Sequence, residues 1–163
     1  MKKFLAITLG ATVVASSVMC AFAADNISKF SSKFRKNFKD CDKYEETVTT
    51  FSEGEEYKFE RSIKGWRNGY CIYEEVVSSA SGAYNVSCKL SHLQLDDLSD
   101  AMKSRSKELE KHELDLYFEQ TDPKTGKPKY VKGGSTTIKG NRAYIAWAKV
   151  QNNPYFCKAE KLR

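Results

Sequence analysis

The sequence has few of the residues, and none of the short motifs, on which common catalytic sites are built. It contains only two histidines, His92 and His112, and no CxxC pair, Gly-x-Ser-x-Gly motif or glycine-rich phosphate loop. These absences argue against thiol–disulfide exchange, a zinc ribbon, α/β-hydrolase chemistry and phosphate-loop chemistry. We therefore predict that the protein is not an enzyme and uses no cofactor.

Grouped metal ligands are also scarce. His92, Asp96 and Asp100 recur every four residues and would share one face of a helix, which is a candidate metal face. However, Asp96 and its neighbour Asp97 fall early in the predicted helix, where carboxylates suit the positive end of the helix dipole. This simpler interpretation is favoured, and we expect no bound metal.

Long apolar runs are absent after the first residues of the chain. The start carries Lys2 and Lys3, then an apolar run, and then Ala21-Phe22-Ala23, the small-x-small pattern that signal peptidase cleaves. We predict a signal peptide over residues 1–23 and a single exported domain over 24–163, periplasmic or secreted. Acylation of Cys20 is the less favoured alternative, because the residues before it do not fit a lipoprotein signal.

Removal of Cys20 leaves an even number of cysteines. In an exported chain, Cys41, Cys71, Cys88 and Cys157 predict two disulfides, for which three pairings exist.

Acidic residues are scarce in the C-terminal part of the chain. Residues 124–163 contain ten Lys or Arg against Glu160 alone, whereas residues 42–60 are acidic, and the formal net charge is +6. This asymmetry indicates either an ordinary solvated surface or an electrostatic binder of anionic envelope polymers or lipid. We expect a monomer with no nucleic-acid partner and no membrane span, although peripheral membrane contact is an alternative.

The pattern of apolar residues and turn signals predicts an α+β fold. A helix is expected over 27–40, capped by Asp25 or Asn26, and a second helix begins at the capping-box sequence Ser91–Gln94. The second helix should end between Lys111 and Phe118. A third is expected over Asn141–Gln151. Between the first two lies a predicted antiparallel meander of four strands: Tyr44–Phe51, Glu55–Trp66, Tyr70–Ser78 and Ala83–Leu90.

One segment has two interpretations. Residues 114–120 either extend the second helix or pair with 129–132 as a hairpin around Asp122–Gly126.

The turns of the meander predict its register. A Glu53-Gly54 turn places Tyr44 opposite Ile63, and a three-residue Arg67–Gly69 loop places Ile63 opposite Tyr73. A Ser79-Ala80 turn then places Tyr73 opposite Val86. The resulting apolar rows are Tyr44–Ile63–Tyr73–Val86 and Val48–Phe59–Val77–Gly82, on a face that the helices should cover.

The same register predicts the disulfides. Cys71 falls opposite Cys88, which suits a cross-strand bridge, and by elimination Cys41 pairs with Cys157.

The first predicted helix is basic but carries an apolar stripe. Phe30, Phe34 and Phe38 are spaced three or four residues apart between lysines. Such a helix could lie on a membrane surface or close a protein core. Core closure is favoured, because the apolar face of the meander needs a cover.

A polar row accompanies the apolar ones on the same face. The predicted register aligns Glu46, Arg61, Glu75 and Tyr84. Either these charges satisfy one another at a gap between helices, or they form the floor of a cleft in which Arg61 meets an anionic ligand. A hydrolase carboxylate pair is disfavoured, because the intervening Arg61 favours the ionised form of both glutamates.

The segments "SIKGWRNGYCIYEE" and "VSCKLSHLQLDDLSDAM", followed by the late Cys157, resemble small exported bacterial proteins that are uncharacterised. The order of a helix and a four-stranded meander is also similar to cystatin-type architecture, which implies inhibition of a secreted enzyme. This chain departs from that architecture in its C-terminal helices. The leading hypothesis is a non-enzymatic binding or interaction module whose ligand contacts the polar row or the basic C-terminal third.

Overall fold

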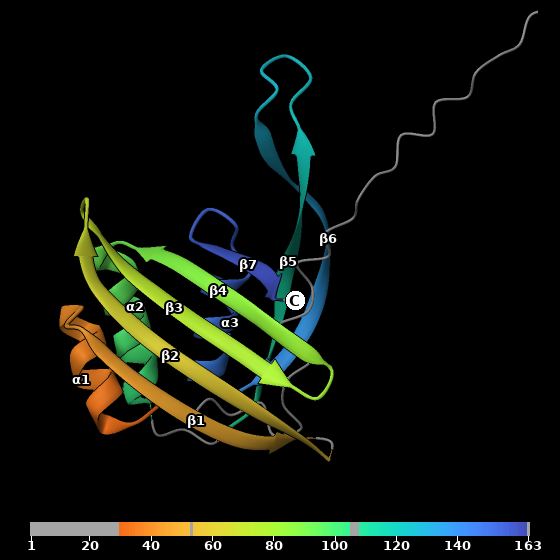
Figure 1. The fold of residues 1–163 in the computed structure, drawn as a ribbon. Coiled ribbons are helices and arrows are strands. Elements are labelled where there is room, and N and C mark those ends of the chain that lie inside the picture. Colours follow the sequence, from red (N-terminus) through yellow and green to blue (C-terminus); the bar gives the residue numbers. More distant parts are fainter. Residues whose placement is uncertain (1–29, 53, 105–107, 163) are drawn as a thin grey trace, which may run out of the picture.

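The computed structural model describes residues 30–52, 54–104 and 108–162. It confirms the α+β class and adds one strand, Cys157–Leu162, that the sequence did not predict. A five-stranded antiparallel sheet has the order β1-β2-β3-β4-β7, and β5 and β6 form a separate two-stranded sheet. All three helices lie on one side of the five-stranded sheet (Figure 1). The elements in chain order are α1 (Ser32–Asp40), β1 (Tyr44–Ser52), β2 (Glu55–Arg67), β3 (Tyr70–Ser79), β4 (Gly82–Leu90), α2 (His92–Lys103), β5 (Glu110–Thr121), β6 (Pro128–Gly140), α3 (Arg142–Gln151) and β7 (Cys157–Leu162).

Side-chain caps set the starts of the helices. Ser31 caps α1 by accepting a hydrogen bond from the Phe34 amide, so the helix begins later than predicted, and the proposed caps Asp25 and Asn26 lie outside the described residues. The capping box at Ser91 and Gln94 is present, as predicted for α2. Asn141 caps α3, which ends at Gln151 as expected.

The predicted end of α2, between Lys111 and Phe118, is wrong. The helix stops at Lys103, and β5 begins at Glu110. The misleading signal was Leu109, which stands seven residues after Met102 and so continues the apolar spacing of the helix, but its side chain is exposed.

The first predicted register is correct, the second is correct as far as Ile63, and the third is shifted. Tyr44 lies opposite Ile63, and Ile63 lies opposite Tyr73. A bulge after Ile63 then allows a two-residue Asn68-Gly69 turn, in which both residues have positive φ, in place of the predicted three-residue loop.

Between β3 and β4 the turn is Ala80-Ser81 instead of Ser79-Ala80. Tyr73 therefore faces Cys88, not Val86. A shift of two residues keeps every side chain on its predicted face but changes its partner across the strands.

The predicted disulfide pairing is wrong for this reason. Cys71 lies opposite Leu90, not Cys88. The bridges are Cys41–Cys71, with 5.8 Å between the Cα atoms, and Cys88–Cys157, with 4.0 Å. The first ties the end of α1 to the start of β3, and the second joins β4 to β7, a strand that the sequence did not predict.

The phenylalanine stripe of α1 closes the core, as predicted. Phe34 and Phe38 are fully buried, and both rings contact Tyr73 edge-on at centroid distances of 6.1 Å. Trp147 of α3 packs on the same tyrosine at 5.0 Å. Each buried phenylalanine contributes about 1.5–3 kcal/mol by its burial, so α1 is held mainly by this face.

The open question about residues 114–120 is resolved as a hairpin. β5 pairs with β6 along its length, with a register shift after Leu116. Its base packs on α3 through a small apolar cluster of Leu114, Ile138 and Ile145. The outer part, residues 117–132, projects from the rest of the molecule and is called the arm below (Figure 1). Among the described helices, none is long and apolar enough to cross a membrane.

Candidate functional site

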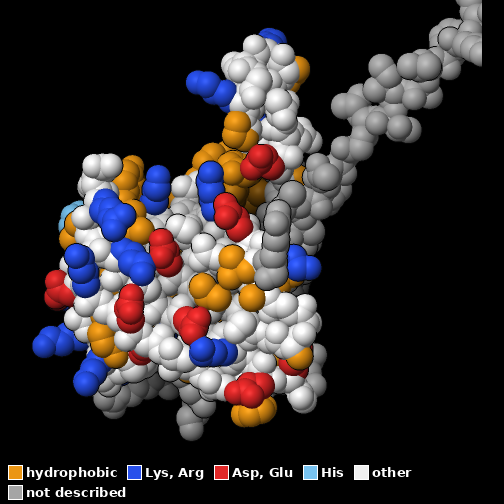
Figure 2. Space-filling view, viewed as in Figure 1, with side chains coloured by type: hydrophobic (Ala, Val, Ile, Leu, Met, Phe, Trp, Pro, Cys, Tyr) orange, Lys and Arg blue, Asp and Glu red, His pale blue; other side chains and the backbone are white. Residues whose placement is uncertain are grey.

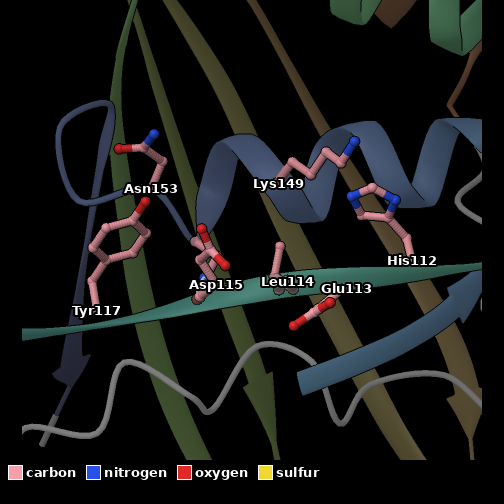
Figure 3. A pocket seen from close by; sticks show the side chains of 8 residues that line it. His112, Glu113, Leu114, Asp115, Tyr117, Lys149 and Asn153 are labelled. Carbon is pink, nitrogen blue, oxygen red and sulfur yellow. Dashed lines mark hydrogen bonds between the residues drawn. The ribbon is translucent and has the colours of Figure 1, made fainter. Parts of the chain in front are cut away.

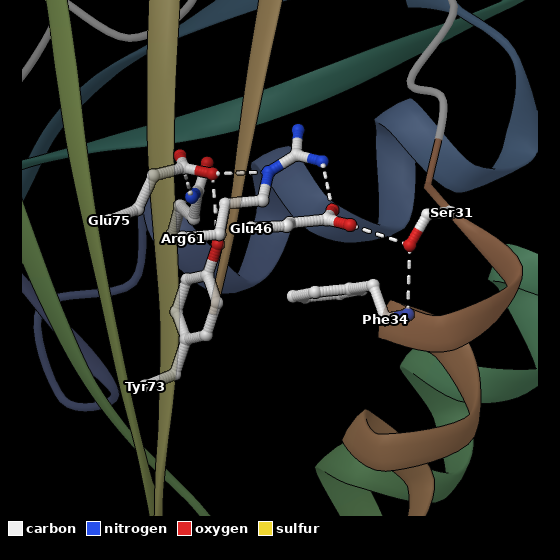
Figure 4. A network of polar contacts seen from close by, with 7 residues as sticks. Ser31, Phe34, Glu46, Arg61, Tyr73 and Glu75 are labelled. Atoms are coloured by element: carbon white, nitrogen blue, oxygen red, sulfur yellow. Dashed lines mark hydrogen bonds and ion pairs between the residues drawn. The ribbon is translucent and has the colours of Figure 1, made fainter. Parts of the chain in front are cut away.

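Three members of the predicted polar row meet under α1. Arg61 Nε donates to Glu75 Oε2 at 2.9 Å, and its terminal nitrogen donates to Glu46 Oε1 at 3.2 Å (Figure 4). The Tyr73 hydroxyl donates to the same oxygen of Glu75 at 2.8 Å, and Gln151 Nε2 donates to its other oxygen at 3.1 Å. β1, β2, β3 and α3 thus all contribute to one network.

The network also reaches the start of α1. The Ser31 hydroxyl, which caps the helix, donates to Glu46 Oε2 at 2.5 Å. The Arg61 guanidinium lies 4.8 Å from the centre of the Phe30 ring and 5.7 Å from that of Phe34. These contacts place aromatic faces over the cation, where the attraction strengthens as water is excluded.

Burial and mutual pairing set the electrostatics of the network. Burial is the largest single influence on Arg61 and opposes its charge, but its partners together, Glu75 first and then Tyr73 and Glu46, outweigh burial and raise the pKa of Arg61. Burial, and then the negative charge of Glu75, raise the pKa of the Tyr73 hydroxyl well above its usual value. Arg61 and Glu75 are 8% and 2% exposed, so little of either charge faces solvent.

Tyr84 does not belong to this row. The shift of β4 places it opposite Val77, and the buried Val86 stands opposite Glu75 in its place. Of the two interpretations of the row, the geometry favours charges that satisfy one another, because both carboxylates already accept from Arg61. Ligand binding by Arg61 stays a prediction.

A hollow lies elsewhere, between β5 and the C-terminal half of α3. It has a volume of about 210 Å³ and is lined by strand residues 112–115 and Tyr117, together with Lys149, Asn152 and Asn153. Asn152 holds the two walls together, because its side-chain amide donates to the Asp115 carbonyl. We call this hollow the α3–β5 pocket.

The two ends of the α3–β5 pocket differ in chemistry. Lys149 and His112 lie side by side at one end, while Tyr117 and Asn153 stand at the other (Figure 3). Within the part of the chain that the structure describes, neither Lys149 nor His112 has a hydrogen-bond or ion-pair partner. Asp115, in contrast, pairs with Lys132 at 2.6 Å.

These pocket residues were not predicted. Lys149 occupies an exposed position of a helix that the sequence did predict, but His112 and Tyr117 come from the segment whose helical or strand character was open. Only the hairpin places them against α3, and no local sequence pattern encodes that packing.

The basic C-terminal third is not one continuous cationic surface. The hairpin lays its lysine-rich strand, β6, beside the acidic strand β5, and the Lys132–Asp115 ion pair joins the two. The carboxylates of β5 and the following turn are Glu110, Glu113, Asp115, Glu119 and Asp122. They offset much of the positive charge that the sequence segment suggested.

On α2, His92 of the candidate metal face packs against an aromatic ring. His92 stacks on Trp66, with 4.1 Å between the ring centres. Among the described residues, no group of three or more His, Cys, Asp or Glu side chains is placed to hold a metal ion.

No protein family matches the sequence, and no curated protein or solved structure is significantly similar to it.

Proposed function

We propose that the protein is an exported, non-enzymatic binding module whose ligand occupies the α3–β5 pocket. The observation that carries this proposal is the pair of Lys149 and His112, two donors without protein partners at one end of a hollow. His112 is half-buried and Lys149 is exposed, so both can be reached from solvent. Two donors that converge on one hollow without pairing to the protein favour an anionic ligand there.

The chemistry of the pocket favours a small ligand that carries a carboxylate or a phosphate. The Lys149 ammonium attracts an anion, and the adjacent imidazole donates a hydrogen bond to it. Tyr117 and Asn153 at the far end offer hydroxyl and amide groups to neutral polar atoms of the ligand. The site contains no arranged nucleophile and base, which supports binding over catalysis.

Export is supported by two observations. The sequence begins with the signal-peptide pattern over residues 1–23, and the two disulfides are compatible with an oxidising compartment. The alternatives drawn from the sequence, electrostatic capture of anionic envelope polymers or lipid and inhibition of a secreted enzyme, stay predictions. The acidic strand beside the lysines of β6 weakens the first of these.

The proposal can be tested by NMR titration of the mature protein with inorganic phosphate and with galacturonate. Amide shifts should concentrate at residues 112–117 and 149–153, and the variant Lys149→Gln should weaken binding of the preferred anion about tenfold. Lys139→Gln, a change of another exposed lysine of the same region, is the matched control and should bind as the wild type does. If neither anion shifts these residues, or if both lysine variants behave alike, the pocket is not the site.

A further inference from the structure

Beyond the Tyr117 end of the α3–β5 pocket, the chain that follows Asn153 carries an exposed tyrosine, Tyr155. Residues 152–156 follow the hairpin outward, from the Asn152 contact with Asp115 to a ring contact between Tyr155 and Tyr130 of β6. The Tyr155 amide donates to the side chain of Asn153, which lines the pocket, at 3.0 Å. Asn153 therefore stands at one end of the pocket and two residues from an aromatic surface at the base of the arm.

That aromatic surface is exposed. Tyr155 is 66% accessible, and Tyr130 packs edge-on against it with 5.7 Å between ring centres. Figure 2 shows hydrophobic side chains gathered where the arm leaves the rest of the molecule. The Asn153 bond holds the Tyr155 backbone and the Tyr130 ring packs on its side chain, so a ligand that packs on Tyr155 would meet a partly preorganised surface.

The path is long and narrow. His112 and Tyr117 stand five residues apart on a strand, a separation of about 17 Å at the rise of an extended chain. The pocket volume of about 210 Å³ is small for that length. A compact ligand would fill only one end, whereas a slender chain could extend from Lys149 to Tyr155.

We infer that this path binds a short acidic oligosaccharide, a sugar chain with carboxylate groups. Lys149 and His112 would receive a carboxylate, Tyr117 and Asn153 would bond to hydroxyls, and the C–H face of a sugar ring would pack on Tyr155. This inference rests on the proposed function of the pocket and extends it by naming the class of ligand.

An extended peptide fits the same length but not the same groups. Peptides that lie along a strand are held mainly by backbone amides and carbonyls of that strand. Here the Asp115 carbonyl already accepts from Asn152, and the pocket instead presents the imidazole, ammonium, phenol and amide groups of side chains. The groups on offer therefore favour a sugar chain.

The test compares α-1,4-linked trigalacturonate with galacturonate, by calorimetry or NMR, on the mature protein. The trimer should bind about tenfold more tightly than the monomer, because only the trimer reaches Tyr155. Tyr155→Ala should remove this gain and leave monomer affinity unchanged, while Lys149→Gln should weaken both ligands. Tyr70→Ala, another exposed tyrosine at the distant β2–β3 turn, is the matched control and should change neither affinity.

The outcomes separate this inference from the function on which it rests. Equal binding of monomer and trimer, or a trimer affinity that Tyr155→Ala does not alter, overturns the oligosaccharide path but leaves the pocket intact. Monomer binding that Lys149→Gln does not change overturns the pocket itself. Triglutamate binding as tightly as trigalacturonate, with the same dependence on Tyr155, would assign the path to acidic peptides instead. Maltotriose binding as tightly as trigalacturonate would remove the role of charge.

Discussion

At the scale of single residues, Arg61 shows how a charged side chain can be a structural element. Its guanidinium is 8% exposed, bonds to carboxylates from two other strands and lies against three phenylalanine rings. Taking these charges out of water is costly, and their mutual attraction offsets that cost only while all partners are present. The network therefore makes the position of α1 over the sheet dependent on Arg61.

Replacement of Arg61 with Ala should destabilise the protein. The change leaves Glu75, which is 2% exposed, buried without a counter-charge, and breaking such a pair costs about 3–5 kcal/mol. Urea denaturation followed by far-ultraviolet circular dichroism measures the effect. Lys64→Ala removes the ion pairs to Glu45 and Glu74 on the exposed face and should cost under about 1 kcal/mol. An Arg61→Ala protein of wild-type stability that has lost affinity for galacturonate would restore the ligand-binding interpretation of the polar row.

Tyr73 should make stability depend on alkaline pH. Its pKa is raised in the folded protein, so folding favours the protonated hydroxyl. This contribution is complete below about pH 10, where both states keep the proton, and it is lost as pH rises further, because the unfolded chain ionises first. By about pH 11 the loss is on the order of 1 kcal/mol.

The variant Tyr73→Phe isolates this effect. At neutral pH it should be less stable by about 1.5–3 kcal/mol, because the hydrogen bond to the Glu75 carboxylate is lost. The difference from wild type should then shrink between about pH 9 and pH 11, measured by urea denaturation at each pH. A constant difference between wild type and Tyr73→Phe would contradict the argument.

At the scale of elements, sequence predicts which face a side chain occupies better than which residue it pairs with. The alternation of Ile63, Tyr73 and Val77 placed these side chains correctly on the helix-covered face. The β3–β4 turn, however, lies in a run of small residues over 78–82, where neighbouring turn centres are chemically almost equivalent. A turn displaced by one residue moves the register by two, and both the cysteine pairing and the position of Tyr84 changed with it.

In the polar network under α1, the strand residues were predicted and the helix residues were not. Glu46, Arg61 and Glu75 come from the two strand pairs whose turns contain Gly54 and Asn68-Gly69, and they were placed together correctly. Gln151 and Ser31 complete the network from two helices, and no sequence rule fixes how a helix is rotated over a sheet. Strand β7 (Cys157–Leu162) has only a short alternation of Cys157 and Ala159 with charged residues, too little to predict a strand.

The hairpin offers a test of packing within one element. A Cβ atom on Gly133 would stand 1.9 Å from the Phe118 ring, whereas a Cβ atom on Gly134 meets nothing within 4 Å. Gly133→Ala should therefore displace Phe118 and destabilise the arm by about 1–3 kcal/mol, and Gly134→Ala should change it by under about 0.5 kcal/mol. Hydrogen exchange of the amides in β5 and β6 measures the difference. Equal exchange in the two variants would show that Phe118 does not lie over Gly133.

At the scale of the whole molecule, the helix-covered sheet and the arm have separate sources of stability. The main core joins α1, α2, α3 and the five-stranded sheet, and the two disulfides fasten the same elements. The hairpin depends on the small cluster of Leu114, Ile138 and Ile145 at its base. Among the described residues, the arm makes one ring contact with the rest of the molecule, that of Tyr130 with Tyr155.

Shortening the arm should therefore leave the fold intact. Residues 118–131 can be replaced by Asn-Gly, which closes a two-residue hairpin between the paired residues Tyr117 and Lys132. The loss should be about 1 kcal/mol, the scale of one aromatic contact, whereas Leu114→Ala at the base should cost about 2–4 kcal/mol. Urea denaturation compares the two variants.

The shortened protein keeps every residue that lines the α3–β5 pocket but loses Tyr130, whose ring packs on Tyr155. It should bind galacturonate as the wild type does and trigalacturonate more weakly, whereas loss of cooperative unfolding would show that the arm is part of the main core.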